Sequence, residues 1–304
     1  MRYLITHGHI FKNAGSTFDD SLQNAFAEAF YDHRDDAAML SGGAKYLNKL
    51  ILSRPDLLAL SSHHLCNPLP ISDEYVCLPV YFIRHPIERI LSVYSFERKQ
   101  NADTPGAIAA AKYSLLDYIK WRFDSQRHLV ISNYQVAYIG AQHQITLQKP
   151  AGLKELKACI AKHQQENCFF GVVDEFGKSF SKFRSYVKEY FPDIEFNYKI
   201  QNVTSADSYG DKLVNATRQL EPVLDLLYSM NTYDLALYDY IKALYSIDDT
   251  PSVGPVIEPD VSQQQIDALS MESIEITNEN LESSVSREIG KPKEILTNLP
   301  GASK

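Results

Sequence analysis

The sequence predicts an α/β fold. Two segments support this prediction, because each combines a short apolar run, a polar turn and a helical pattern. In the first, residues 3–5 form the apolar run, and Phe18, Leu22 and Phe26 then follow at helical spacing. In the second, the β-branched and aromatic run at residues 80–83 precedes Pro86, which suits the first turn of a helix.

The composition divides the 304 residues into a body and a tail. No Phe, Tyr or Trp follows Tyr245, and residues 246–304 contain 11 of the 38 acidic residues but only 4 of the 30 basic ones. The body is nearly neutral and aromatic enough to build a core, whereas the tail has the low hydrophobicity of a linker. We expect a domain at residues 1–246 and an acidic linker or disordered tail at 247–304 that links to another domain or partner.

Several classes of protein are disfavoured by the sequence. No run approaches the roughly 20 apolar residues of a membrane span, and the first strand leaves no room for a signal peptide, so we expect a soluble, cytoplasmic protein. A neutral body without a basic run disfavours nucleic-acid binding. The four cysteines form no CxxC pair, which favours reduced thiols over a zinc site or disulfides.

The turn after the first strand has the residues of an anion site. Gly15 lets the backbone approach a ligand closely, and Ser16 and Thr17 place hydroxyls at a helix N-terminus. Unpaired N–H groups and the helix dipole favour a negative charge there, and Lys12 adds a full positive charge. A strand-to-helix turn without a ligand is the competing interpretation.

This turn differs from the Walker A loop, in which lysine lies between the last glycine and Ser or Thr. Here the lysine, Lys12, lies three residues before Gly15, so it approaches the anion from another part of the loop. We expect Asp19 and Asp20 in the first turn of the helix that follows.

Two histidines follow a second short apolar run, at residues 58–60. A strand there delivers His63 or His64 to its carboxyl end, where ligands of open α/β sheets bind. A surface or capping histidine is the alternative.

An arginine follows the third run. Pro79 suggests that the regular strand begins at residue 80, so Arg84 lies at its end and Ser92 lies two turns into the next helix. A guanidinium can bind phosphate in a bidentate manner and a hydroxyl can complete the site. An ion pair between Arg84 and Glu88 is the competing interpretation.

These motifs together resemble those of a known family. The stretch from His9 to Thr17 resembles the 5′-phosphosulfate loop of sulfotransferases, with Phe11 where proline is usual. The pattern Arg84-x-Pro86-x-x-Arg89-x-x-Ser92-x-Tyr94 resembles their 3′-phosphate signature. The chain is most similar to the carbohydrate sulfotransferases that use PAPS (3′-phosphoadenosine 5′-phosphosulfate), such as heparan sulfate 2-O-sulfotransferases and their bacterial relatives.

The resemblance implies a P-loop, nucleotide-kinase-like fold with a mostly parallel sheet and helices on both faces. It implies transfer of a sulfuryl group from PAPS to a hydroxyl, with PAP as product and no metal. The acceptor that it implies is a glycan or glycoconjugate. The cofactor-binding residues it implies are Lys12, Asn13, Ala14, Gly15, Ser16, Thr17, Arg84 and Ser92. Lys12 is also catalytic, and the family's Ser-Gly-His-Leu stretch matches residues 62–65 so that His64 is the base, or His63 if the register slips.

Looser similarities continue along the body. Residues 133–140, 169–175 and 231–238 resemble an Asn-x-Gln stretch, a late strand and a terminal helix of the family. Amphipathic helices are expected at 107–127 and 178–191, and acceptor contacts at 101–106 and 138–150. Two alternatives remain: a kinase-like enzyme that uses a nucleoside triphosphate, which should need a strand-terminal Asp and magnesium, and a non-catalytic nucleotide-binding module.

Overall fold

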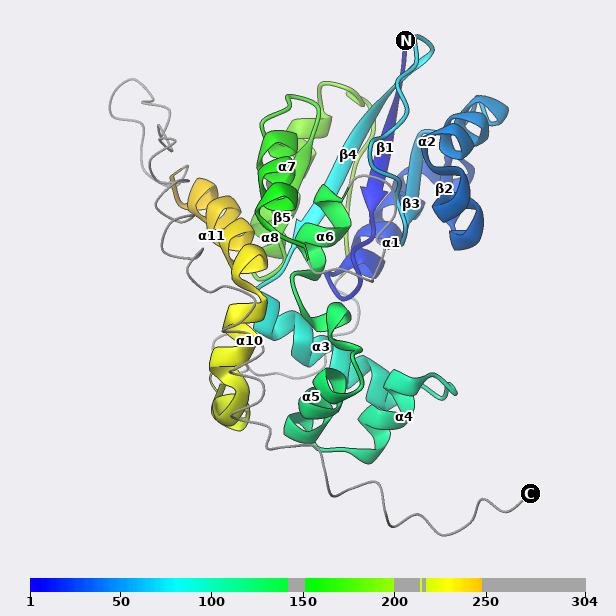
Figure 1. Cartoon of the computed structure of the whole chain (residues 1–304). Coiled ribbons are helices and arrows are strands. Elements are labelled where there is room, and N and C mark those ends of the chain that lie inside the picture. Colours follow the sequence, from blue (N-terminus) through cyan, green and yellow to red (C-terminus); the bar gives the residue numbers. More distant parts are fainter. Residues whose placement is uncertain (142–150, 200–213, 215–216, 248–304) are drawn as a thin grey trace, which may run out of the picture. The chain divides into compact units, whose positions relative to one another are not determined.

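The computed structural model describes residues 1–141, 151–199, 214 and 217–247. These residues belong to one compact unit, Met1–Thr250 (Figure 1). The predicted tail therefore lies outside the described residues from position 248 onward, and its role stays a prediction. None of the described helices has the length and apolar character that crossing a membrane requires.

A five-stranded parallel sheet forms the centre of the unit, in the order β2-β3-β1-β4-β5. Its strands are β1 (Arg2–Gly8), β2 (Phe30–His33), β3 (Ala59–Ser62), β4 (Tyr75–Ile83) and β5 (Phe169–Val172). The chain leaves β1 toward β2 on one side and later crosses to β4 on the other. The loops after β1, β3 and β4 therefore meet at a point where the strand order reverses, which is where ligands bind in such sheets.

Helices cover both faces of the sheet, which confirms the predicted fold class. On one face, α1 (Gly15–Phe26) and α8 (Phe176–Val187) bury phenylalanines against Ile5, Val80 and Phe82. On the other face, α2 (Asp36–Ser53), α6 (Tyr134–Gly140), α7 (Leu153–His163) and α11 (Thr232–Ile247) pack on Leu4, Leu60 and other strand residues. Successive strand residues thus face opposite layers, as the pleat requires.

A separate helical cluster has its own apolar core. It contains α3 (Pro86–Lys99), α4 (Pro105–Lys112), α5 (Leu115–Asp124) and α10 (Leu224–Met230). Figure 1 shows α3, α4 and α5 beyond the carboxyl ends of the strands. Short 3₁₀ turns at Ala27–Ala29, His128–Ile131 and Glu221–Val223 complete the described elements.

Three element predictions need correction. The strand β4 begins at Tyr75 rather than after Pro79, and it pairs with β1 through Pro79 itself. Proline is tolerated because β5 pairs with β4 only from Val80 onward, so β4 has one neighbouring strand at Pro79. The helix expected at 107–127 is two helices, α4 and α5, because Ser114 caps a new helix. The helix expected at 178–191 is α8, which ends at Val187.

Candidate functional site

The loop between β1 and α1 has an unusual backbone. Lys12 and Ala14 adopt positive φ angles of 68° and 59°, in the left-handed region that residues other than glycine rarely occupy. Ala14 is the N-cap of α1, and its side chain offers no oxygen to the first amides of the helix. Gly15 begins the helix, and the side chain of Ser16 is exposed beside it. This helix N-terminus therefore lacks the side-chain cap that most helices have.

Positive charge gathers around this loop. The Lys12 ammonium lies 4.4 Å from the centre of the Phe96 ring and is half-buried. Burial lowers the pKa of Lys12, and the charges of Arg84 and Lys99 lower it further. Three neighbouring cations, of which Lys12 and Arg84 are half-buried, favour a bound anion, because its charge would relieve their repulsion.

Arg84 lies at the carboxyl end of β4, as predicted, and touches the loop. Its Nη1 donates to the carbonyl oxygen of Lys12 at 3.2 Å, and its Nη2 lies 3.3 Å from Oε2 of Glu88. The ion pair considered from sequence is therefore present, and it fixes one side of the guanidinium beside the loop. Ser92 lies two turns along α3 and is half-buried.

Two buried side chains fix the loop between β1 and α1 to the protein interior. Asn13 Nδ2 donates to the carbonyl oxygen of Phe82 at 2.7 Å and to Oε1 of Gln135 at 2.6 Å. Arg89 is fully buried, and its guanidinium donates to the carbonyl oxygens of Phe11 and Val130. The side chain of Asn13 thus faces the protein interior, so any contact with a cofactor must come from its backbone.

The two candidate bases lie in the turn that directly follows β3, at the carboxyl end of the strand where the sequence predicts them. The strand β3 ends at Ser62, so alternation along an extended strand does not set the directions of His63 and His64. His63 Nδ1 donates to the carbonyl oxygen of His9 at 3.1 Å, which leaves its Nε2 as the acceptor nitrogen. His64 instead places Nε2 3.7 Å from Oδ2 of Asp36.

A pocket of about 360 Å³ opens beside His64. Its apolar walls come from Met39, Leu40, Leu65, Pro68 and Tyr138. Lys45 and the kinked turn at Gly42 and Gly43 line another side. The pocket includes Tyr138 and Ala141 from the predicted acceptor segment 138–150, of which residues 142–150 lie outside the described residues. Residues 101–106, the other predicted segment, do not line it.

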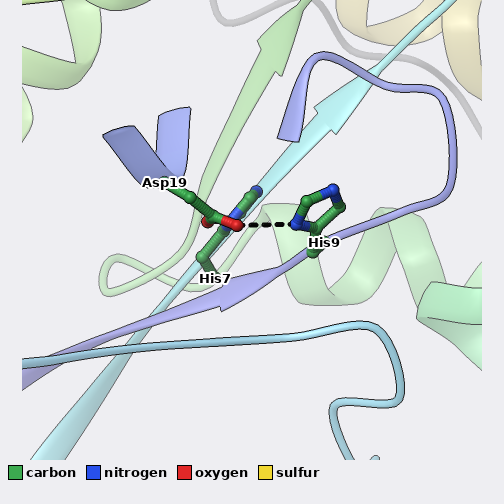
Figure 2. Close-up of side chains that lie close together, drawn as sticks. All are labelled: His7, His9 and Asp19. Carbon is green, nitrogen blue, oxygen red and sulfur yellow. Dashed lines mark hydrogen bonds and ion pairs between the residues drawn. The ribbon is translucent and has the colours of Figure 1, made fainter. Parts of the chain in front are cut away.

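A buried cluster that the sequence did not indicate lies beneath the loop (Figure 2). His7 Nδ1 donates to Oδ1 of Asp19 and His9 Nδ1 donates to Oδ2, both at 2.7 Å. Asp19 and Asp20 lie beyond the first turn of α1, contrary to the prediction, and Asp19 is buried. The spacing His-x-His at a strand end was the available signal, since such residues share one face.

The charges of this cluster follow from its contacts. Burial acts to raise the pKa of Asp19, but its contacts with His7 and His9 outweigh that effect and hold the pKa well below its usual range. Burial lowers the pKa of His7. It also lowers the pKa of His63 to about 4, and His9 acts in the same direction. Asp19 is therefore ionised at neutral pH, while His7 and His63 are neutral.

The same three residues could in principle bind a metal ion. In the described part of the chain, the candidate ligand atoms of His7, His9 and Asp19 lie within 4.8 Å of one another. Both Nδ1 atoms, however, already face the carboxylate at hydrogen-bond distance, and His7 is 1% exposed. The contacts fit a hydrogen-bonded cluster, and the absence of a metal from the reaction stays a prediction.

A second buried polar network joins two helix N-termini. Asn133 Oδ1 accepts from the amides of Tyr233 and Asp234 at the start of α11. In return, Asp234 accepts from the amides of Gln135 and Val136 at the start of α6. Asn231 completes the pair, because its Oδ1 accepts from the amide of Asn133. The stretches 133–140 and 231–238 therefore cap each other.

Gln135 connects this network to the candidate site. Its Oε1 accepts from Asn13 Nδ2 and from the amide of Arg84, and its Nε2 donates to the carbonyl oxygen of Arg84. One side chain thus joins the loop after β1 to the end of β4. Through Asn13 and the backbone of Arg84, the network helps to position Lys12 and Arg84.

Comparison with known proteins identifies a relative by sequence. No protein-family model matches the chain. An uncharacterized protein of Archaeoglobus fulgidus is 32% identical over 208 residues, which cover 66% of this chain and 80% of that protein. Among solved structures, a mouse sulfotransferase complexed with PAP covers 95% of this chain and 87% of its own, with 9% identity and a TM-score of 0.38. A TM-score this low supports no conclusion from the likeness.

Proposed function

We propose that this chain, which belongs to the same family as the Archaeoglobus fulgidus protein, transfers a sulfuryl group from PAPS to an acceptor hydroxyl. One observation supports the proposal above the others. The uncapped N-terminus of α1, the cation of Lys12 and the guanidinium of Arg84 converge on one loop at the carboxyl end of the sheet. Such an arrangement suits a ligand with two separate anionic groups.

The cofactor would be held by two sets of groups. The backbone from Lys12 to Gly15, with the hydroxyls of Ser16 and Thr17, would bind the 5′-phosphosulfate. Arg84 and Ser92 would bind the 3′-phosphate. The ion pair with Glu88 fixes the Nη2 side of the Arg84 guanidinium, and Nη1 lies against the loop. These assignments follow the resemblance residue by residue.

The reaction would be an in-line displacement at sulfur. The acceptor oxygen forms a new S–O bond while the bond from sulfur to the bridging phosphate oxygen breaks, and PAP leaves with that electron pair. Lys12 would stabilise the charge that develops on the leaving phosphate, as cations do in phosphoryl transfer. The acceptor's proton would pass to a histidine base.

His64 is the proposed base, with His63 as the alternative. His64 lines the 360 Å³ pocket, so an acceptor that fills the pocket would meet its imidazole. His63 offers a free Nε2, but its ring packs on His9, with ring centres 4.1 Å apart. A carbohydrate hydroxyl is the acceptor that the resemblance implies, and one sugar ring is within the size of the pocket.

Calorimetry with PAP and AMP tests the proposal. Because Arg84 and Ser92 would bind the phosphate that AMP lacks, we expect PAP to bind about ten- to a hundredfold more tightly, equivalent to about 1.5–3 kcal/mol. Arg84→Ala should remove most of that preference, whereas Arg98→Ala, an exposed arginine on α3, should retain it. Equal affinities for PAP and AMP would exclude the proposed cofactor, and tight binding of ATP with magnesium would favour a kinase.

A further inference from the structure

We propose that His9 is part of the anion site and that binding of the 5′-phosphosulfate, or of the 5′-phosphate of PAP, is accompanied by uptake of a proton at Nε2 of His9. Asp19 acts as the positioning residue, because it holds the opposite nitrogen of the ring. The inference rests on the proposed function, and it adds to the loop a contact that neither the motif nor the resemblance assigns.

The ring of His9 lies directly against the loop. A Cβ atom built on Gly15 would come within 2.3 Å of His9 Nε2 and 2.2 Å of Cδ2, so the imidazole occupies the space that any side chain at this position would fill. Figure 2 shows the ring inside the curve of the loop, with Nδ1 turned toward Asp19 and the other nitrogen turned away from it. The edge of the imidazole that bears Nε2 therefore borders the first residue of α1, where the anion would bind.

The hydrogen bond between His9 and Asp19 determines whether Nε2 of His9 accepts or donates. Nδ1 of His9 donates to the Asp19 carboxylate, so Nε2 is an acceptor in the neutral ring and a donor only in the imidazolium. An anion at the helix N-terminus needs donors, and it favours the charged ring through its own negative charge. Asp19 favours the same form, because its carboxylate is already ionised.

The surroundings direct the proton to His9 rather than to its neighbours. His7, on β1, shares the carboxylate but is 1% exposed and neutral. His63 packs on the other side of the ring, is neutral, and has Arg34 and Asp36 as its nearest other charges. Lys12, in the same loop, would also pair with the anion. Of the three histidines, His9 alone would contact both Asp19 and the anion.

Calorimetry of PAP binding at pH 7.5, in buffers that differ in ionisation enthalpy, measures the proton uptake directly. We expect the whole chain to take up a proton when PAP binds, up to one per PAP, because Nε2 of His9 can donate to the anion only in the imidazolium form. His9→Gln should abolish the uptake and weaken PAP binding about tenfold, the effect of one charge-assisted hydrogen bond. Asp19→Asn should reduce the uptake, whereas His128→Gln should leave it unchanged, because the His128 ring stacks on Phe123 in the helical cluster.

Nitrogen NMR of ¹⁵N-histidine in the unaltered protein gives an independent readout that does not depend on a variant folding. Saturation with PAP should convert one histidine from a single protonated nitrogen to two, and that signal should be missing in His9→Gln. If PAP binds more tightly than AMP but no proton is taken up and no histidine changes, the role of His9 is wrong and the proposed function stands. If PAP does not bind, both are wrong.

Discussion

The helix N-termini of α6 and α11 are capped by side chains, whereas the N-terminus of α1 is not. At α6 and α11 the first amides are capped by Asn133, Asn231 and Asp234, all of which are buried. At α1 the N-cap is Ala14, and a lysine and an arginine approach it instead. Both sets belong to stretches that resemble sulfotransferase motifs, so the motifs alone do not separate their roles.

The difference lies in where the hydrogen bonds go. Amides that already bond to buried side chains have no capacity for a ligand, and their role is to hold elements together. A helix N-terminus that has cations nearby and no side-chain cap has that capacity. We therefore propose that the junction of α6 and α11 belongs to the scaffold and that the loop at Lys12 binds the ligand.

The largest expected effect is in the ligand-binding region. His64→Ala should lower turnover by about 10²–10⁴-fold, the usual cost of losing a general base, with almost no change in PAP affinity or in thermal stability. His63→Ala should cost much less. Single-turnover assays with labelled PAPS measure both variants. If the two costs are reversed, His63 is the base, and if neither slows transfer, a histidine base is excluded.

At the junction of α6 and α11 we expect a substitution to lower the free energy of unfolding rather than the activity. Asp234→Ala leaves the buried amides of Gln135 and Val136 and the Gln135 side chain without their acceptor, at a cost of about 1–3 kcal/mol for each group, so we expect at least about 3 kcal/mol. Denaturant unfolding measures it. Asp225→Ala, an exposed acid on α10, should change stability by less than about 0.5 kcal/mol. Equal losses in the two variants would contradict a special role for the junction.

The smallest effect expected is a pH dependence of stability from the histidines under the loop. Burial lowers the pKa of His63 to about 4, against an unperturbed value of about 6.5 in the unfolded chain. Between these values the unfolded chain binds more protons, so stability should fall as pH falls from about 6.5 toward 4. Thermal melts at pH 7.5 and 5 should show this decrease, and His63→Gln should reduce it. An unchanged pH dependence in that variant would show that His63 is not responsible.

Local pattern was enough to predict much of the fold. The helix that starts at Gly15 follows from the spacing of Phe18, Leu22 and Phe26, which are all buried, and the helix that starts at Pro86 follows from its proline. The position of Arg84 at a strand end was predictable for the same reason, since it directly follows an apolar run.

Contacts between distant segments were not predictable. The sequence places Asp19 in the first turn of the helix; the His-x-His spacing indicates that His7 and His9 share a face, but nothing local indicates that both reach the two oxygens of Asp19. The reciprocal caps join residues about 100 positions apart, and the tolerance of Pro79 depends on where β5 begins. In each case the outcome depends on which segments the fold brings together, and that information is absent from a local window.

Hydrogen exchange of backbone amides, with and without PAP, tests the contrast between the two regions most directly. We predict that PAP slows exchange in a peptide spanning residues 9–18 and leaves a peptide spanning 131–138 unchanged, because only the first contains amides that a ligand can bind. No added protection at 9–18 under saturating PAP, or equal protection in both peptides, would contradict the assignment of the α1 N-terminus as the anion site.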